Sequence, residues 1–327
     1  MPEPQSPIEQ VISLGAPDMA RVNDCIRDSL QSEVVLINQI ANYIVSSGGK
    51  RLRPMLLNLS AHACGYQGQE HIPLAAIIEF IHTATLLHDD VVDESDLRRG
   101  QQSAHAVWGN AASVLVGDFL YSRSFQMMIG LDSMRIMEVL AQTTNTIAEG
   151  EVQQLLNMGD PEVDRQRYMQ VIENKTAKLF EAACQLGAII SGQATEIENA
   201  MAVYGNRLGC AFQIADDVLD YTGDADTMGK NAGDDLAEGK PTLPLIIARE
   251  NCSLEDRELM DAAISNGSAD NLEPILSIIQ QTGSLDSAME VARNMAAEAR
   301  ESIALLPESP WRDALGLLAD YSIDRNH

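Results

Sequence analysis

The sequence has few prolines in its middle and no pattern of β-strands. All 12 prolines lie between positions 2 and 73, at 161, or from 241 onward, and no stretch alternates apolar and polar residues convincingly. Long proline-free segments with an apolar period near 3.6 residues are typical of helices. We therefore expect one all-α domain over residues 1–327, a helical bundle with a central cavity.

Basic residues, paired cysteines and long apolar runs are also scarce. The 22 basic residues face 48 acidic ones, and the net charge of −26 argues against nucleic acid and anionic membrane surfaces as general partners. The five cysteines show no CxxC or CxH spacing, so they support neither a disulfide framework nor a zinc site. Without a signal-peptide pattern or a run of about 18 apolar residues, we expect a cytoplasmic protein with no transmembrane segment.

The apolar periodicity predicts where the helices lie. Residues 8–47 are expected to form two packing helices, broken near Gly15-Ala16-Pro17. Four long helical segments are expected further on, over residues 112–128, 134–156, 168–190 and 194–221. A polar, glycine-containing loop from Gly229 to Lys240 is then expected to act as a lid, although an ordinary exposed connection would have the same composition.

An apolar helical stripe that includes Phe80 and Leu87 leads directly into three aspartates, Asp89, Asp90 and Asp93. Asp89 and Asp93 are four residues apart and share a helix face, so carboxylate oxygens can converge there on hard cations. A single DDxxD string is more often a solvated helix end. A second apolar run, however, ends in the same spacing at Asp216, Asp217 and Asp220. Two such helices are hard to explain as solvated faces, because solvated faces do not continue a buried stripe.

The few basic residues are concentrated in clusters. Arg98 and Arg99 follow the first aspartate motif, and Lys50, Arg51 and Arg53 follow a glycine turn at the start of an expected helix. One guanidinium group can donate two parallel hydrogen bonds to phosphate oxygens, and the free backbone N–H groups at the start of a helix add to the positive potential. Acids for divalent cations together with these clusters indicate a diphosphate ligand.

These motifs resemble those of the trans-type isoprenyl diphosphate synthases, and among them the bacterial octaprenyl diphosphate synthases. The likeness covers nearly the whole chain from Gly48, and its markers occur in the order of the family. They are GGKRLRP at Gly48 to Pro54, the first DDxxD with its RRG, Lys175-Thr176, Phe212-Gln213 with the second DDxxD, and GKNAGDDLAEGKPTLP from Gly229 to Pro244. The resemblance implies packing helices over 1–47, a catalytic core over 48–244 and scaffold helices over 245–327.

The resemblance also implies an activity. Members of the family are Mg²⁺-dependent prenyltransferases, usually with three ions, that condense isopentenyl diphosphate with an allylic diphosphate such as farnesyl diphosphate. The expected product is octaprenyl diphosphate for a quinone side chain, as in ubiquinone biosynthesis. The family further implies a homodimer.

The roles of individual residues follow from the same resemblance. The expected metal ligands are Asp89, Asp90 and Asp93 for two ions, and Asp216 with Asp217 and Asp220 for the third. The expected diphosphate ligands are Arg98, Lys175, Lys230 and Lys240 for the allylic substrate, and Lys50, Arg53, His82 and Arg99 for isopentenyl diphosphate. Thr176, Gln213 and the Lys175 backbone are expected to direct oxygen dipoles at the carbocation. His82 taken alone would be a core histidine, and His88 is expected to be structural.

Product length is expected to depend on the depth of the cavity. In the family, the fourth and fifth residues before the first DDxxD lie under the growing chain, and here they are the small residues Thr85 and Ala84. A product longer than farnesyl diphosphate is therefore expected. Phe125, Met127 and Met128 are candidates for the floor of the cavity, although a core role is equally compatible with this methionine-rich face.

Several alternatives remain open from the sequence. A synthase of other product length, making geranylgeranyl, heptaprenyl or nonaprenyl diphosphate, has the same motifs. A class I terpene cyclase typically has an NSE/DTE-type second motif, which the second DDxxD argues against. A non-catalytic subunit of a heteromeric synthase predicts degraded motifs, whereas these are intact. A calcium-binding structural protein explains the acids but not the basic clusters.

Overall fold

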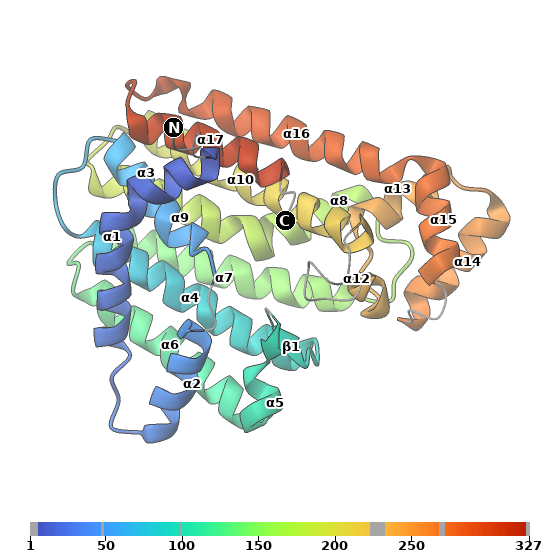
Figure 1. The fold of residues 1–327 in the computed structure, drawn as a ribbon, viewed down its shortest axis with the longest axis horizontal. Coiled ribbons are helices and arrows are strands. Elements are labelled where there is room, and N and C mark those ends of the chain that lie inside the picture. Colours follow the sequence, from blue (N-terminus) through green and yellow to red (C-terminus); the bar gives the residue numbers. More distant parts are fainter. Residues whose placement is uncertain (1–5, 47–48, 99, 223–232, 268–271, 325–327) are drawn as a thin grey trace, which may run out of the picture. The chain divides into compact units, whose positions relative to one another are not determined.

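The computed structural model describes residues 6–46, 49–98, 100–222, 233–267 and 272–324. These residues form helices joined by short connections, together with one small antiparallel hairpin of β1 (Leu97–Arg98) and β2 (Gln101–Gln102) (Figure 1). The predicted all-α class is confirmed. Among the described residues, no helix is both long enough and apolar enough to cross a membrane.

The long helical segments form close to their predicted bounds. They are α6 (Asn110–Ile129), α7 (Met134–Asn157) and α10 (Thr195–Thr222). The remaining segment, predicted as one helix over 168–190, is divided into three parts. These are α8 (Arg165–Ile172), a five-residue π-helix η1 (Glu173–Ala177) and α9 (Lys178–Ile190).

The predicted break near Gly15-Ala16-Pro17 is wrong. Helix α1 (Pro7–Ser29) continues through Pro17, and the chain leaves the helix only before α2 (Val35–Ser46). A proline removes one backbone hydrogen bond. Here the loss is tolerated because α1 is anchored on both sides of Pro17, with Val11 and Gly15 buried before it and Val22 and Ile26 buried after it.

The chain divides into two compact units. Unit 1 comprises Met1–Thr144, Leu179–Ala202 and Ile303–Leu318, and unit 2 comprises Asn145–Lys178, Val203–Ser302 and Ala319–His327. The expectation of a single domain with three consecutive parts stays a prediction.

Helix α4 (His71–Val92) is the centre of the unit 1 core. It packs against α1, α3 (Leu52–Ala63), α5 (Ala104–Trp108) and, most extensively, α6 (Figure 1). A β-carbon at Gly117 of α6 would lie 2.4 Å from Nε2 of His88 on α4, so a larger residue there would require the His88 ring to move. Because α4 is buried over most of its length, the aspartates at its end are held on a rigid support.

The unit 2 core includes the second half of α10. Val218 and Ile214 of this helix pack with Tyr168 of α8 and with Ile246 and Ala292. The remaining elements of the chain are α12 (Asp234–Ala237), α13 (Leu243–Asn251), α14 (Leu254–Asn266), α15 (Leu272–Thr282), α16 (Ser284–Ser302), the 3₁₀ turn η3 (Ile303–Leu305) and α17 (Pro310–Ile323).

Candidate functional site

The first aspartate motif ends α4, as predicted. Asp93 is the C-cap, and its N–H donates to the carbonyl oxygen of Asp89 at 2.8 Å. Asp89 is half-buried, whereas Asp90 is fully buried with 0% of its surface exposed. The Nε–H group of Arg98, in β1, donates to Oδ1 of Asp90. The hairpin therefore brings Arg98, a predicted diphosphate ligand, into contact with Asp90, a predicted metal ligand.

The charge of Asp90 depends on two opposing effects. Burial raises the pKa of Asp90 above its usual range, because the ionised form is poorly solvated. The Arg98 guanidinium opposes this rise through its charge and its hydrogen bond. The pair is thus a partly buried ion pair, in which each group compensates the charge of the other.

A basic cluster lies at the start of α3. Nη1 of Arg53 lies 3.0 Å from Nε2 of His82 on α4, and its guanidinium carbon lies 4.4 Å from the centre of the Phe180 ring. Lys50 is exposed. The structure therefore brings Arg53 and His82 together, two residues that the sequence assigned to one diphosphate.

The second aspartate motif lies in the last turns of α10. Asp216 is exposed, whereas Asp217 and Asp220 are buried. The hydroxyl of Tyr168 donates to Oδ2 of Asp217 at 2.6 Å, and Nε2 of Gln213 donates to its Oδ1 at 2.8 Å. Burial raises the pKa of Asp217 well above its usual range, and the negative charge of Asp235 adds to the rise.

The Lys175-Thr176 pair lies in the π-helix η1. Oγ1 of Thr176 donates to Oε1 of Gln213 at 3.0 Å, and Nζ of Lys175 lies 2.6 Å from a carboxylate oxygen of Glu151. Single π-turns are rare and occur frequently at functional sites. Thr176, Gln213, Asp217 and Tyr168 thus form one continuous chain of hydrogen bonds within unit 2.

Gly150 of α7 explains how the π-helix is accommodated. A β-carbon at this position would lie 2.6 Å from the backbone nitrogen of Lys175, closer than real contacts allow. The sequence pattern did not reveal the roles of Gly150 and Tyr168 or the π-helix. Periodicity alone does not distinguish a π-turn from an α-helix, and a glycine inside a helical pattern signals a close approach without naming the partner.

The other predicted residues are distributed as follows. Lys240 is half-buried and pairs with Glu238. Ala84 and Met128 are fully buried in unit 1, and Oγ1 of Thr85 donates to the carbonyl oxygen of His82 at 2.8 Å. Arg99 and residues 229–232 of the predicted lid, including Lys230, lie outside the described residues.

The structure contains an unpredicted group of potential metal ligands. In the described part of the chain, one set of at least three histidine, cysteine or carboxylate groups has its ligand atoms within 4.8 Å of one another. The set is Asp18, His62 and His71, and it includes none of the motif aspartates.

Comparison with known proteins places this arrangement in a family. Residues 34–279 match the family model described as polyprenyl synthetase. The octaprenyl diphosphate synthase of Escherichia coli (strain K12) is 51% identical over 320 residues, which cover 98% of this chain and 99% of that protein. The chain belongs to the polyprenyl synthetase family. The predicted resemblance and the prediction of a prenyltransferase are confirmed.

Other relatives differ in the product that their names state. The all-trans-nonaprenyl-diphosphate synthase (geranyl-diphosphate specific) of Rhodobacter capsulatus is 44% identical and covers 97% of this chain and 98% of its own length. Among solved structures, a polyprenyl synthase from Caulobacter crescentus, complexed with calcium and isoprenyl diphosphate, has a TM-score of 0.94 at 42% identity, covering 99% of this chain and 100% of that one.

Proposed function

We propose that this protein is an all-trans octaprenyl diphosphate synthase, which adds isopentenyl diphosphate units to an allylic primer such as farnesyl diphosphate. The observation that carries the proposal is the 51% identity to an octaprenyl diphosphate synthase along 98% of the chain. The two aspartate motifs with their buried second carboxylates, the Arg53–His82 pair and the π-helix with its polar chain support it.

The reaction is a 1′–4 condensation. The bond between C1 and oxygen of the allylic diphosphate breaks, and the resulting allylic cation is attacked by the double bond of isopentenyl diphosphate. A new carbon–carbon bond forms, and one proton leaves. The released pyrophosphate accepts that proton, so the reaction needs no protein base.

The motif residues fit Mg²⁺, because their carboxylates provide only oxygen ligands, which hard cations prefer. Asp89, Asp90 and Asp93 would hold two ions and Asp216, with Asp217 and Asp220, a third. When bound, these ions neutralise the negative charge that develops on the departing pyrophosphate.

The basic residues would bind the two diphosphates. Lys50, Arg53 and His82, together with Arg99, would hold isopentenyl diphosphate, which has no metal of its own in this proposal and so depends on cationic side chains. The contact between Arg53 and His82 supports this assignment. The allylic diphosphate would be bound by Arg98, Lys175, Lys230 and Lys240.

The polar chain of unit 2 would orient oxygen dipoles toward the allylic cation. Thr176 donates to Oε1 of Gln213, while the amide nitrogen of Gln213 donates to Asp217. These two bonds fix which end of the Gln213 amide is the acceptor. An oxygen held in this way stabilises positive charge without the cost of reorientation during the reaction.

Product length, quinone pathway and assembly belong to the same proposal. Small residues at 84 and 85 would leave room for a long chain, with Met128 near the end of it. Octaprenyl diphosphate would supply a quinone side chain, as in ubiquinone biosynthesis, and the protein would act as a homodimer.

The test is incubation of purified protein with farnesyl diphosphate, labelled isopentenyl diphosphate and Mg²⁺. We expect labelled, solvent-extractable product, and we expect EDTA to abolish it. A complete lack of product with farnesyl, geranyl and geranylgeranyl diphosphate as primers would contradict the proposal and favour a non-catalytic subunit.

A second candidate is a synthase with a different chain length. This chain is 44% identical to a nonaprenyl diphosphate synthase and 51% identical to an octaprenyl diphosphate synthase. Relatives of similar sequence thus differ in the product that their names state, which supports the second candidate. The motifs are shared between the two candidates, and the length of the isolated product distinguishes them.

A further inference from the structure

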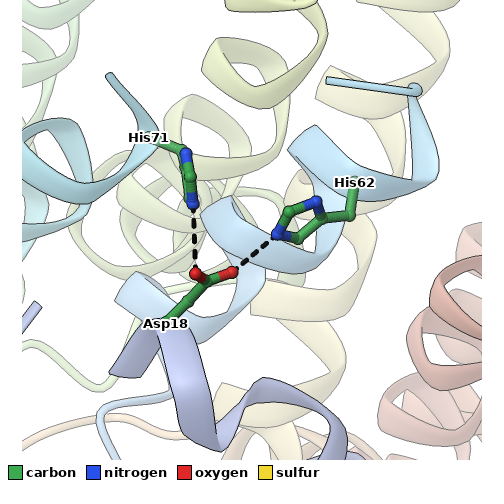
Figure 2. A group of neighbouring side chains, drawn as sticks. All are labelled: Asp18, His62 and His71. Carbon is green, nitrogen blue, oxygen red and sulfur yellow. Dashed lines mark hydrogen bonds and ion pairs between the residues drawn. The ribbon is translucent and has the colours of Figure 1, made fainter. Parts of the chain in front are cut away.

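Three potential metal ligands converge in unit 1 from separate helices. Asp18 lies in the middle of α1, His62 in the last turn of α3, and His71 is the first residue of α4. Figure 2 shows both imidazole rings directed at the carboxylate of Asp18.

The distances are close to those of a metal site. Nε2 of His62 lies 2.6 Å from Oδ2 of Asp18, and Nε2 of His71 lies 3.4 Å from Oδ1. Zinc ligands at about 2.0–2.1 Å from a tetrahedral ion are about 3.3 Å apart from one another. Small side-chain movements, chiefly of His62, would therefore create the geometry.

His71 provides an independent sign of a missing ligand. The residue is 1% exposed, and neither of its ring nitrogens makes a hydrogen bond of good geometry in the described part of the chain. The 3.4 Å contact with Asp18 is longer than a good hydrogen bond. Buried polar atoms without hydrogen-bond partners are rare in native proteins, and some of them are ligands of a bound ion.

Neighbouring aromatic rings hold the two histidines in place. The ring of Trp311 stacks on His62 with centroids 4.4 Å apart, and Tyr66 packs edge-on against His71 at 5.6 Å. The side chains of Asp18 and His62 remain 15% and 22% exposed, so an ion could enter from solvent and keep a water molecule as its fourth ligand.

We propose that Asp18, His62 and His71 form a binding site for one Zn²⁺ ion, which fastens α1 to α3 and α4. Two imidazole nitrogens and one carboxylate suit zinc rather than the magnesium expected at the aspartate motifs. No cysteine is involved, so the lack of cysteine spacing in the sequence does not bear on this site.

One cation competes with zinc for Asp18. Nη1 of Arg21 lies 3.3 Å from Oδ1 of Asp18. The Arg21 side chain is 45% exposed and also contacts Gln69, so it can give up the carboxylate without losing all its interactions. Without zinc, Asp18 would keep its hydrogen bonds with His62 and Arg21.

The test is a zinc titration of the full chain after removal of metals, with millimolar Mg²⁺ present to occupy sites made only of oxygen ligands. We expect one equivalent of Zn²⁺ to bind and to raise the thermal unfolding midpoint. His62→Ala and Asp18→Asn should each weaken binding by at least about tenfold. His71 is fully buried, so His71→Ala can unfold the protein, and the test relies on the two partly exposed ligands.

His88→Ala is the matched control. Nε2 of His88 lies 3.4 Å from Oδ1 of Asp118, the same distance that separates His71 from Asp18. His88 and Asp118 are not part of the group of three potential ligands, so removing the His88 ring should leave zinc binding unchanged. Co²⁺ gives a second readout, since a tetrahedral site has strong visible absorption and quenches nearby tryptophan. In a Trp108→Phe variant, which retains Trp311, Co²⁺ should quench fluorescence, and His62→Ala should prevent the quenching.

Two results would overturn the proposal. One is that the wild type binds no zinc in the presence of Mg²⁺, which would leave Asp18 as a hydrogen-bonded centre only. The other is that His62→Ala and Asp18→Asn bind zinc as tightly as the wild type, which would locate the ion elsewhere. Because the readouts are binding and unfolding, either result is independent of prenyltransferase activity.

Discussion

The two aspartate motifs share one spacing, but their surroundings within their own units differ. Each buries its second aspartate, Asp90 in unit 1 and Asp217 in unit 2. Asp90 is paired with a cation, Arg98, whereas Asp217 accepts hydrogen bonds from two neutral groups, Tyr168 and Gln213. Equal spacing in the sequence therefore does not mean equal electrostatics.

The pKa shifts express the same difference. Burial raises the pKa of both carboxyl groups, but Arg98 opposes the rise at Asp90, while the charge of Asp235 adds to it at Asp217. The first motif is thus partly balanced by protein charge. At the second motif the hydrogen bonds from Tyr168 and Gln213 counter the rise without adding a positive charge, so an added divalent cation should stabilise it more.

Loss of the first aspartate of either motif should have the largest effect on turnover. Asp89→Ala and Asp216→Ala should each lower turnover by orders of magnitude and leave the fold intact, because acids at a metal site repel one another without the metal. Turnover and circular dichroism check this, with the exposed Glu138→Ala as control. Unchanged turnover in either variant would contradict the metal role of that motif.

Distortion of the π-helix should affect the surroundings of the second motif alone. Gly150→Ala places a β-carbon 2.6 Å from the backbone nitrogen of Lys175 and 2.9 Å from Asn174, so α7 and the π-helix must move apart at this point. We expect turnover to fall by about 10- to 100-fold, as small misplacements of catalytic groups do. Gly316→Ala in α17 is the matched control, because its β-carbon meets no atom within 4 Å. Equal activity of both variants would show that the close approach does not position Lys175.

Double-mutant cycles should separate the two buried carboxylates. We expect Arg98→Gln with Asp90→Asn to show a coupling of about 2–3 kcal/mol, since a buried charge loses its counter-ion. Tyr168→Phe with Asp217→Asn should show about 1 kcal/mol, typical of a hydrogen bond from a neutral donor. Unfolding by denaturant measures both. Equal coupling energies for the two pairs would contradict the electrostatic difference between the motifs.

A substitution just before the first motif should have the smallest effect on turnover, but it should change the length of the product. Ala84→Phe should shorten the product, because a large side chain would stand under the growing chain. Ala76→Phe is the control, as it is another fully buried alanine of α4. Both substitutions overpack the core by about 1–3 kcal/mol, so a change in length seen with Ala84→Phe alone reflects position rather than instability. An unaltered length would show that the chain does not pass residue 84.

Much of the fold could be predicted because its signals are local. Proline positions and apolar period located α6, α7 and α10 within a few residues, and the apolar runs that precede Asp89 and Asp216 proved to be buried helices. The continuity of α1 through Pro17 could not be predicted, since it depends on burial against other segments of the chain.

The contacts around the candidate ligands could not be predicted, because they join distant residues. Tyr168 and Asp217 are 49 positions apart, and Asp18 and His62 are 44 apart. No local spacing marks such pairs. The aspartate motifs could be predicted as ligand sets because their carboxylates lie within about one helical turn of one another. A group of residues brought together from α1, α3 and α4 has no signature in any one of these helices.

The most direct measurement of the central claim is the length of the product. Purified protein incubated with farnesyl diphosphate, labelled isopentenyl diphosphate and Mg²⁺ should give a series of products, and separation by chain length should show it ending at forty carbons, the octaprenyl chain. A series that ends at a different length would contradict the octaprenyl assignment, while leaving the prenyltransferase chemistry in place.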